Sequence, residues 1–146
     1  MRAVVTRVSR ASVSVDGEIT GQIGAGFLVL LGVGPNDTEE TARKLADKIC
    51  NLRVFEDENG KMNRSLEQIQ GSILAVSQFT LYADTSSRRP GFSGAAKPEL
   101  AEPLYECFMR QCRERGFPVE HGVFGADMDV DSLNQGPVTI LFDTDV

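Results

Sequence analysis

The sequence predicts an α+β fold: a mainly antiparallel, curled or barrel-like sheet with two amphipathic helices. Short apolar or alternating runs, separated by Gly, Asp and Asn turns, predict about seven or eight strands. Two longer segments have apolar residues at helical spacing. With 146 residues, 41% of them hydrophobic, the chain is long enough to bury a core without disulfides or metals. We therefore expect a single domain over residues 1–146.

The first third of the chain predicts a β meander followed by a helix. Polar and apolar residues alternate over residues 2–15, and residues 18–23 return after an Asp-Gly turn. Residues 27–33 are almost all apolar, which is typical of a strand that is buried on both faces. Asp37 or Thr38 then caps a helix whose apolar positions share one face: Ala42, Leu45, Ala46, Ile49 and Cys50.

The rest of the chain predicts further strands around a second helix. A short strand covers residues 52–55 and a buried one ends at Gln78. A long loop rich in Gly, Ser and Pro covers residues 82–97, and a helix runs from Pro98 to near Gly116. We expect three last strands, joined by turns at Gly125-Ala126 and Gln135-Gly136, and a frayed acidic tail: residues 119–124, 128–133, 138–142 and 143–146.

Composition and charge exclude several classes of function. No apolar run approaches the roughly 18 residues of a membrane span, and the alternating N-terminus is unlike a signal peptide, so we expect a cytoplasmic protein without a membrane partner. The net charge of −6 disfavours bulk attraction to nucleic acid. An RNA partner must therefore meet a local basic patch.

Side chains for acid-base or metal chemistry are scarce. The one histidine, His121, stands on a presumed strand, and GFSGA (91–95) lacks the second glycine of a nucleophile elbow. Three alternating carboxylates (Asp127, Asp129, Asp131) favour a solvated face over a metal site, and the three cysteines lack ligand spacing. We expect no metal and no cofactor, so an enzyme of this sequence takes its base from elsewhere than a protein side chain.

Two segments combine a buried strand with unusual polar or backbone features. Ser77, Gln78, Phe79 and Thr80 follow an apolar run, where backbone N–H groups can form an oxyanion hole, although the same residues can simply end a strand. Gly136-Pro137 precedes another apolar strand and is interpretable as an ordinary turn, since only about 5–6% of X-Pro bonds are cis. Neither segment decides the function alone.

Together these segments resemble the D-aminoacyl-tRNA deacylases, and the similarity covers nearly the whole chain. SQFT and GPVT, in this order and spacing, are specific to that family. The matching segments are RVSRASV (7–13), GEITGQIGAGFLVLLGV (17–33), DENGKMN (57–63), SQFTLYAD (77–84), RPGFSGAA (89–96), FGADM (124–128) and NQGPVT (134–139).

The resemblance implies a homodimeric enzyme that hydrolyses D-aminoacyl-tRNA, with active sites at the subunit interface. Gly136-Pro137, held cis, enters the partner's pocket and leaves no room for an L side chain, while Arg7 holds the turn and Thr139 supports it. Because glycine has no side chain to exclude, glycine mischarged on tRNA(Ala) is also an expected substrate.

The resemblance also assigns roles within the pocket. Ser77 and Gln78 lie near the amino acid, and the N–H groups of Phe79 and Thr80 face the ester carbonyl. Thr80 is either the nucleophile or a supporting residue, with the ribose 2′-hydroxyl assisting attack by water. The lack of a base beside Thr80 favours the second role. Phe124 and Met128 pack against the terminal adenine of the tRNA 3′ end, and two loop arginines are candidates for contact with the tRNA backbone: Arg88 and Arg89.

Three alternatives remain open from the sequence. An esterase for small acylated metabolites would use Thr80 or Ser77 as a nucleophile. An RNA-end-binding module would bind aminoacyl-tRNA without hydrolysing it. A sister deacylase family keeps the Gly-Pro bond trans and tolerates some L substrates, but SQFT and Arg7 favour the cis family.

Overall fold

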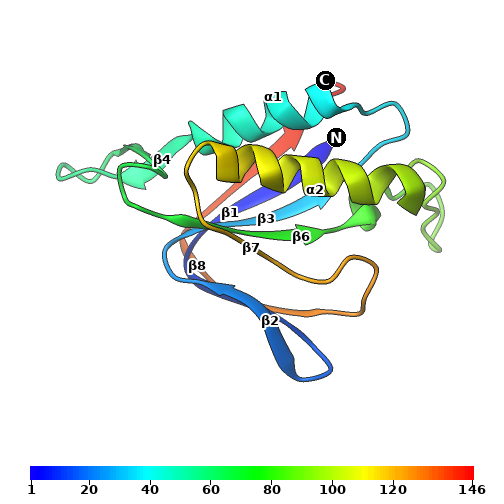
Figure 1. The fold of residues 1–146 in the computed structure, drawn as a ribbon, viewed down its shortest axis with the longest axis horizontal. Coiled ribbons are helices and arrows are strands. Elements are labelled where there is room, and N and C mark those ends of the chain that lie inside the picture. The colour runs from blue at the N-terminus through cyan, green and yellow to red at the C-terminus, as the bar shows by residue number, and fades with distance from the viewer.

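The computed structural model describes all residues from 1 to 146, and it places two helices on one face of a strongly bent sheet (Figure 1). The strands are β1 (Arg2–Val15), β2 (Glu18–Ile23), β3 (Gly26–Gly32), β4 (Arg53–Glu56), β5 (Met62–Ser65), β6 (Ser72–Ser77), β7 (Val119–His121) and β8 (Asp129–Asp143). The helices are α1 (Glu39–Cys50), the 3-10 helix η1 (Phe79–Tyr82) and α2 (Pro98–Glu114). Neither α-helix is long and apolar enough to cross a membrane.

The main sheet is mixed rather than antiparallel throughout. Its strands follow the order β2-β1-β3-β6-β7, and β8 pairs with β1. β1 is antiparallel to β2, β3 and β8, as predicted, whereas β3–β6 and β6–β7 are parallel. The parallel pairs arise because each of these connections contains an α-helix that returns the chain to the same end of the sheet. The predicted curled α+β fold is confirmed, with this correction to the strand directions.

Two apolar clusters fill the two faces of the bent sheet. The larger one lies between the helices and the sheet and includes Phe27 and Ile73, both fully buried. The smaller one lies on the other face and includes Leu28 and Leu74. Because neighbouring residues of a strand point to opposite faces, β3 and β6 contribute to both clusters. β6 is therefore fixed on both faces, just before Ser77.

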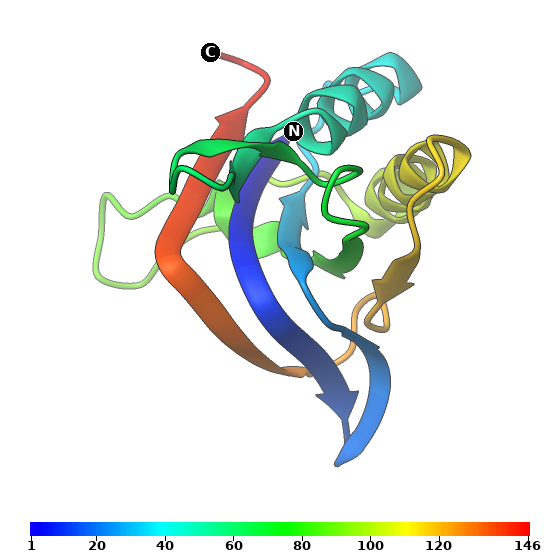
Figure 2. The same ribbon diagram turned by 90° about the vertical axis from the view of Figure 1, so that its left-hand side faces the viewer.

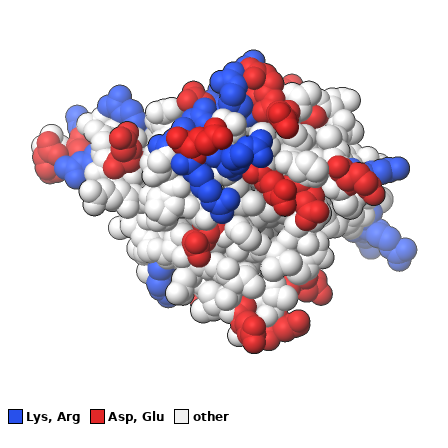
Figure 3. All heavy atoms as spheres, viewed as in Figure 1, with Lys and Arg blue, Asp and Glu red and all other residues white.

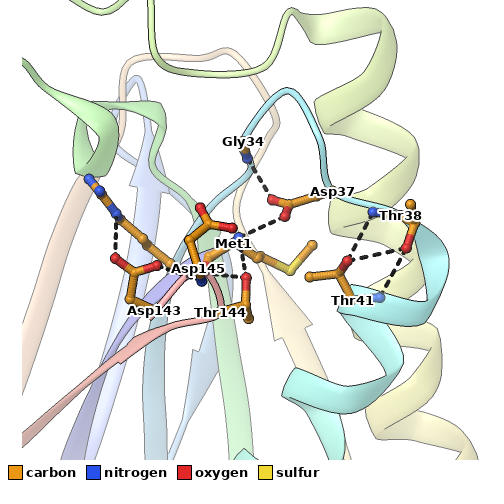
Figure 4. Close-up of polar contacts among 9 residues, drawn as sticks. Met1, Gly34, Asp37, Thr38, Thr41, Asp143, Thr144 and Asp145 are labelled. Carbon is orange, nitrogen blue, oxygen red and sulfur yellow. Dashed lines mark hydrogen bonds and ion pairs between the residues drawn. The ribbon is translucent and has the colours of Figure 1, made fainter.

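The start of α1 is tied to both ends of the chain (Figure 4). Thr38, rather than Asp37, is the N-cap, and it forms a capping box with Thr41. Asp37 accepts hydrogen bonds from the Gly34 amide (2.6 Å) and the Met1 amino group (2.8 Å). That amino group also donates to Thr144 Oγ1 at 2.6 Å. The expectation of a frayed tail over residues 143–146 is therefore wrong at Thr144.

The C-terminal part of the chain forms fewer strands than predicted. β7 ends at His121, and the two strands expected after it are one strand, β8, which runs beside β1 as the outermost strand (Figure 2). Val8 pairs with Asn134 and Thr6 with Thr139, so residues 135–138 bulge out of the ladder. The Gly-Pro pair was interpreted as a turn between strands, but β1 continues past it and holds both sides of the bulge in one strand.

Candidate functional site

The first predicted segment lies where β6 leaves the sheet. Ser77 pairs with Leu31 of β3, and the Gln78 amide donates to the Leu31 carbonyl at 2.8 Å. Phe79 and Thr80 then begin η1. The first N–H groups of a helix have no acceptor within it, so these two amides are available to an external oxygen. Their role as donors to a carbonyl stays a prediction.

The Thr80 hydroxyl has no base beside it. Its hydrogen-bond partner is the Gln78 side chain, whose Nε2 donates to Thr80 Oγ1. His121 is on β7, where its Nδ1 lies 2.6 Å from the Gly122 carbonyl oxygen. An amide cannot take a proton from a hydroxyl at neutral pH, so this arrangement does not activate Thr80 as a nucleophile.

An aromatic pair and a polar loop border this segment. Phe79 is 55% exposed, and its ring contacts Phe92 edge to face with centroids 5.1 Å apart. The backbones of Asp84 and Gly91 pair across the base of the loop. Arg88 and Arg89 lie exposed at the end of this loop. The loop therefore presents both arginines to solvent.

The second predicted segment is the bulge of β8. The Gly136-Pro137 peptide bond is cis. Arg7, only 4% exposed, donates from Nε to the Gln135 carbonyl (2.9 Å) and from Nη1 to the Val54 carbonyl (2.7 Å). A Cβ on Gly136 would lie 2.7 Å from Arg7 Nη2. The buried guanidinium thus links the bulge to β4, and the close approach of the two residues requires glycine.

Asn134 closes the bulge and was not among the predicted site residues. Its Oδ1 accepts a hydrogen bond from the Val138 amide, and its Nδ2 donates to Thr139 Oγ1, both at 3.1 Å. Asn side chains commonly satisfy backbone groups of a neighbouring turn, so an Asn two residues before Gly-Pro is the signal that identifies this role. Thr139 supports the bulge through Asn134.

The two segments lie far apart within one chain. Gly136 is in the bulge beside Arg7, Arg7 pairs with Phe27, and Phe27 pairs with Ile73 of β6. Ser77 is further along β6, and the strands β1 and β3 separate it from β8. Strands are spaced about 4.8 Å apart and rise about 3.3 Å per residue. One chain therefore does not bring Gly136 to its own Ser77–Thr80 segment.

The predicted adenosine residues bracket the connection between β7 and β8. Phe124 packs against the larger cluster, with its ring 6.0 Å from that of Tyr105. Met128 packs against the smaller cluster, and its sulfur lies so near Gly122 that a Cβ there would collide with it. The two side chains thus belong to the same loop but pack against different clusters. Asp129 and Asp131 of the acidic series are exposed, and Asp131 lies 3.7 Å from Arg10.

Comparison with known proteins identifies the family of the chain. The family model described as D-Tyr-tRNA(Tyr) deacylase matches residues 4–143. The chain belongs to this family. A D-aminoacyl-tRNA deacylase of Bacillus pumilus is 59% identical over 145 residues, which cover 99% of each chain. A protein of the same name from Thermus aquaticus is also 59% identical, over 99% of this chain and 95% of its own.

Solved structures agree with the fold of the family. The structure of a protein described as "c-Myc DNA Unwinding Element Binding Protein" superimposes with a TM-score of 0.93 at 46% identity, covering 99% of both chains. A probable eukaryotic D-amino acid tRNA deacylase has the same fold, with a TM-score of 0.83 at 18% identity over 97% of each chain. The family match and the named relatives confirm the family and the enzyme class that were predicted from SQFT and GPVT.

Proposed function

We propose that the chain hydrolyses the ester between a D-amino acid and the 3′-terminal adenosine of tRNA, in a site that two copies of the chain complete. The observation that carries this proposal is the placement of the Gly136-Pro137 bulge on a free edge strand, away from the Ser77–Thr80 segment of the same chain. A second copy is the natural source of the missing half. Aminoacyl-tRNA is used in the cytoplasm, where we place the enzyme.

The surface of β8 supports a homodimer. The strand has 15 residues, pairs on one side only, and exposes the apolar side chains Val130, Leu133 and Leu141 by 41%, 50% and 77%. A long apolar edge strand is a surface that proteins usually cover. In the dimer, the bulge of one copy enters the pocket of the other. Its rigid backbone then excludes an L side chain and accepts a D side chain or glycine, including glycine mischarged on tRNA(Ala).

Hydrolysis in this site uses backbone donors and the substrate's own hydroxyl. The Phe79 and Thr80 amides bind the ester carbonyl oxygen and stabilise the negative charge that develops there, each contributing about 3 kcal/mol. The terminal 2′-hydroxyl assists attack by water, because the Thr80 hydroxyl has only the Gln78 amide beside it. The products are a free D-amino acid and a tRNA with a free 3′ end. Ser77 and Gln78 contact the amino acid, and Phe124 and Met128 contact the adenine.

Matched tyrosyl-tRNAs test this function directly. We expect rapid hydrolysis of D-tyrosyl-tRNA, no acceleration for L-tyrosyl-tRNA, and slow hydrolysis of a D-tyrosyl-tRNA that ends in 2′-deoxyadenosine. Equal rates for the normal and deoxy substrates would show that a protein side chain is the nucleophile. A trapped acyl-enzyme would identify a general esterase. Binding of the D substrate without hydrolysis would show that the protein is an RNA-end-binding module and not an enzyme.

The loop arginines give a separate test of tRNA contact. Reversing both charges, Arg88→Glu with Arg89→Glu, should weaken tRNA binding and flatten its dependence on salt, because fewer counterions are released from phosphates. Binding is measured at several salt concentrations, and Lys48→Glu on the outer face of α1 serves as a charge-reversal control. A salt slope equal to that of the unmodified protein would remove the loop from the interface.

A further inference from the structure

A second feature is a solvent-open cavity of about 540 Å³ between α2 and the start of the β7–β8 connection. Tyr105 donates its hydroxyl to the Ala75 carbonyl at 2.7 Å, and the Gly122 amide donates to the same oxygen at 3.3 Å. Both residues line the cavity. The cavity is therefore anchored on β6 two residues before Ser77.

Phe124 connects the cavity to the proposed adenosine site. Its side chain lines the cavity and packs beside Tyr105. Burial raises the pKa of Tyr105, so this hydroxyl keeps its proton and continues to hold the cavity wall on β6. A nucleic acid whose last base contacts Phe124 has its preceding backbone within reach of the cavity.

The wall formed by the C-terminal half of α2 is basic. Arg110 and Arg113 are three positions apart, so they project from neighbouring turns on one side of the helix, and both line the cavity. Arg113 is held by a hydrogen bond from Nη2 to the Val119 carbonyl (2.9 Å), whereas Arg110 has no ion pair or hydrogen bond from its side chain. Figure 3 shows Lys and Arg side chains over α1 and this half of α2, with Asp and Glu side chains among them. A free guanidinium beside a fixed one suits a phosphate.

The other cavity groups suit the sugar and base of the same nucleotide. With its Nδ1 hydrogen donated to the Gly122 carbonyl, His121 presents Nε2 as an acceptor for a ribose hydroxyl. Glu102 and Glu106 line the cavity toward the N-terminal half of α2, where carboxylates can accept hydrogen bonds from a base amine and would repel a phosphate. The charges thus orient a nucleotide with its phosphate toward Arg110.

We propose that this cavity binds the 5′-phosphate of the terminal adenosine and the nucleotide joined through it, with Arg110 as the principal phosphate ligand. The inference rests on the proposed deacylase function, because it extends the substrate beyond the adenosine. It gives the acidic protein a contact for an RNA phosphate at Arg110, separate from the loop arginines. The enzyme would then distinguish the end of an RNA chain from an isolated aminoacyl nucleoside.

Two small esters test the proposal: 3′-D-tyrosyl-adenosine and the same compound with a 5′-phosphate. We expect kcat/KM of the unmodified enzyme to be about 10-fold higher for the phosphorylated ester, the gain of one charge-assisted hydrogen bond. In Arg110→Gln this ratio falls to about 1. Arg43→Gln removes an exposed arginine of α1 that pairs with Glu40, and it should keep the ratio of the unmodified enzyme.

The outcomes separate the two proposals. Equal rates for both esters, or an unchanged ratio in Arg110→Gln, overturn the phosphate site while the deacylase function stands. A protein that hydrolyses neither ester nor D-tyrosyl-tRNA overturns both. Competition supplies an independent reading: adenosine 5′-monophosphate should inhibit the unmodified enzyme about 10-fold better than adenosine, and this preference should be lost in Arg110→Gln.

Discussion

The Ser77–Thr80 segment and the Gly136-Pro137 bulge differ in how the fold supports them. Ser77 ends a strand that has neighbours on both sides and buried clusters on both faces. The bulge lies on an edge strand that is exposed over most of its length. The first segment is held by many small contacts, and the second depends on a few polar ones. Single substitutions should therefore matter most at the bulge.

Gly136→Ala should cause the largest loss. The new Cβ would lie 2.7 Å from Arg7 Nη2, and the residue has φ near 125°, which an L residue rarely adopts. The bulge must shift, and a displacement of about 1 Å in a catalytic site can cost about 100-fold. We expect kcat/KM for D-tyrosyl-tRNA to fall by about that factor, measured by the rate of deacylation. Gly24→Ala, where a Cβ meets nothing within 4 Å, is the control and should be silent.

A smaller effect is expected for Arg7→Lys. One ammonium group cannot reproduce the fork by which Arg7 reaches the carbonyls of Gln135 and Val54, so the bulge loses one of its ties. The expected cost is about 1.5–3 kcal/mol of folding stability and roughly a 10-fold loss of preference for D over L substrate. Thermal unfolding and paired D and L assays measure the two effects. Arg10→Lys, at an exposed position of the same strand, should change neither quantity.

The sequence predicted the elements around the Ser77–Thr80 segment better than those around the Gly136-Pro137 bulge. Alternation and apolar runs located β1, β3 and β6, and the Pro98 and Thr38 signals located the helices, because these patterns depend on local geometry and burial. The continuity of β8 through Gly136 was missed because it depends on pairing with β1, which is distant in sequence. The parallel pairs of β6 were missed for the same reason.

In the predicted site, too, contiguous motifs were found and contacts between residues distant in sequence were missed. SQFT and GPVT are each a run of consecutive residues, so both can be recognised in the sequence. Their resemblance to the deacylases pointed to the correct family. Asn134 and the Val54 carbonyl were not predicted, since their roles arise only when the bulge folds back on Arg7. The cavity along α2 was also not predicted, because it combines side chains from a helix and a distant strand end.

Thr80→Val should have the smallest effect, and it distinguishes backbone catalysis from a side-chain nucleophile. Valine keeps the shape of threonine and leaves the Phe79 and Thr80 amides at the start of η1 in place. It removes only the hydroxyl that accepts a hydrogen bond from Gln78. If the amides and the ribose hydroxyl carry the reaction, deacylation of D-tyrosyl-tRNA should fall by less than about 10-fold. A loss of about 1,000-fold or more, with Thr20→Val silent, would instead make the Thr80 hydroxyl the nucleophile. The function of the first segment would then depend on one side chain, Thr80, as the shape of the bulge depends on Arg7.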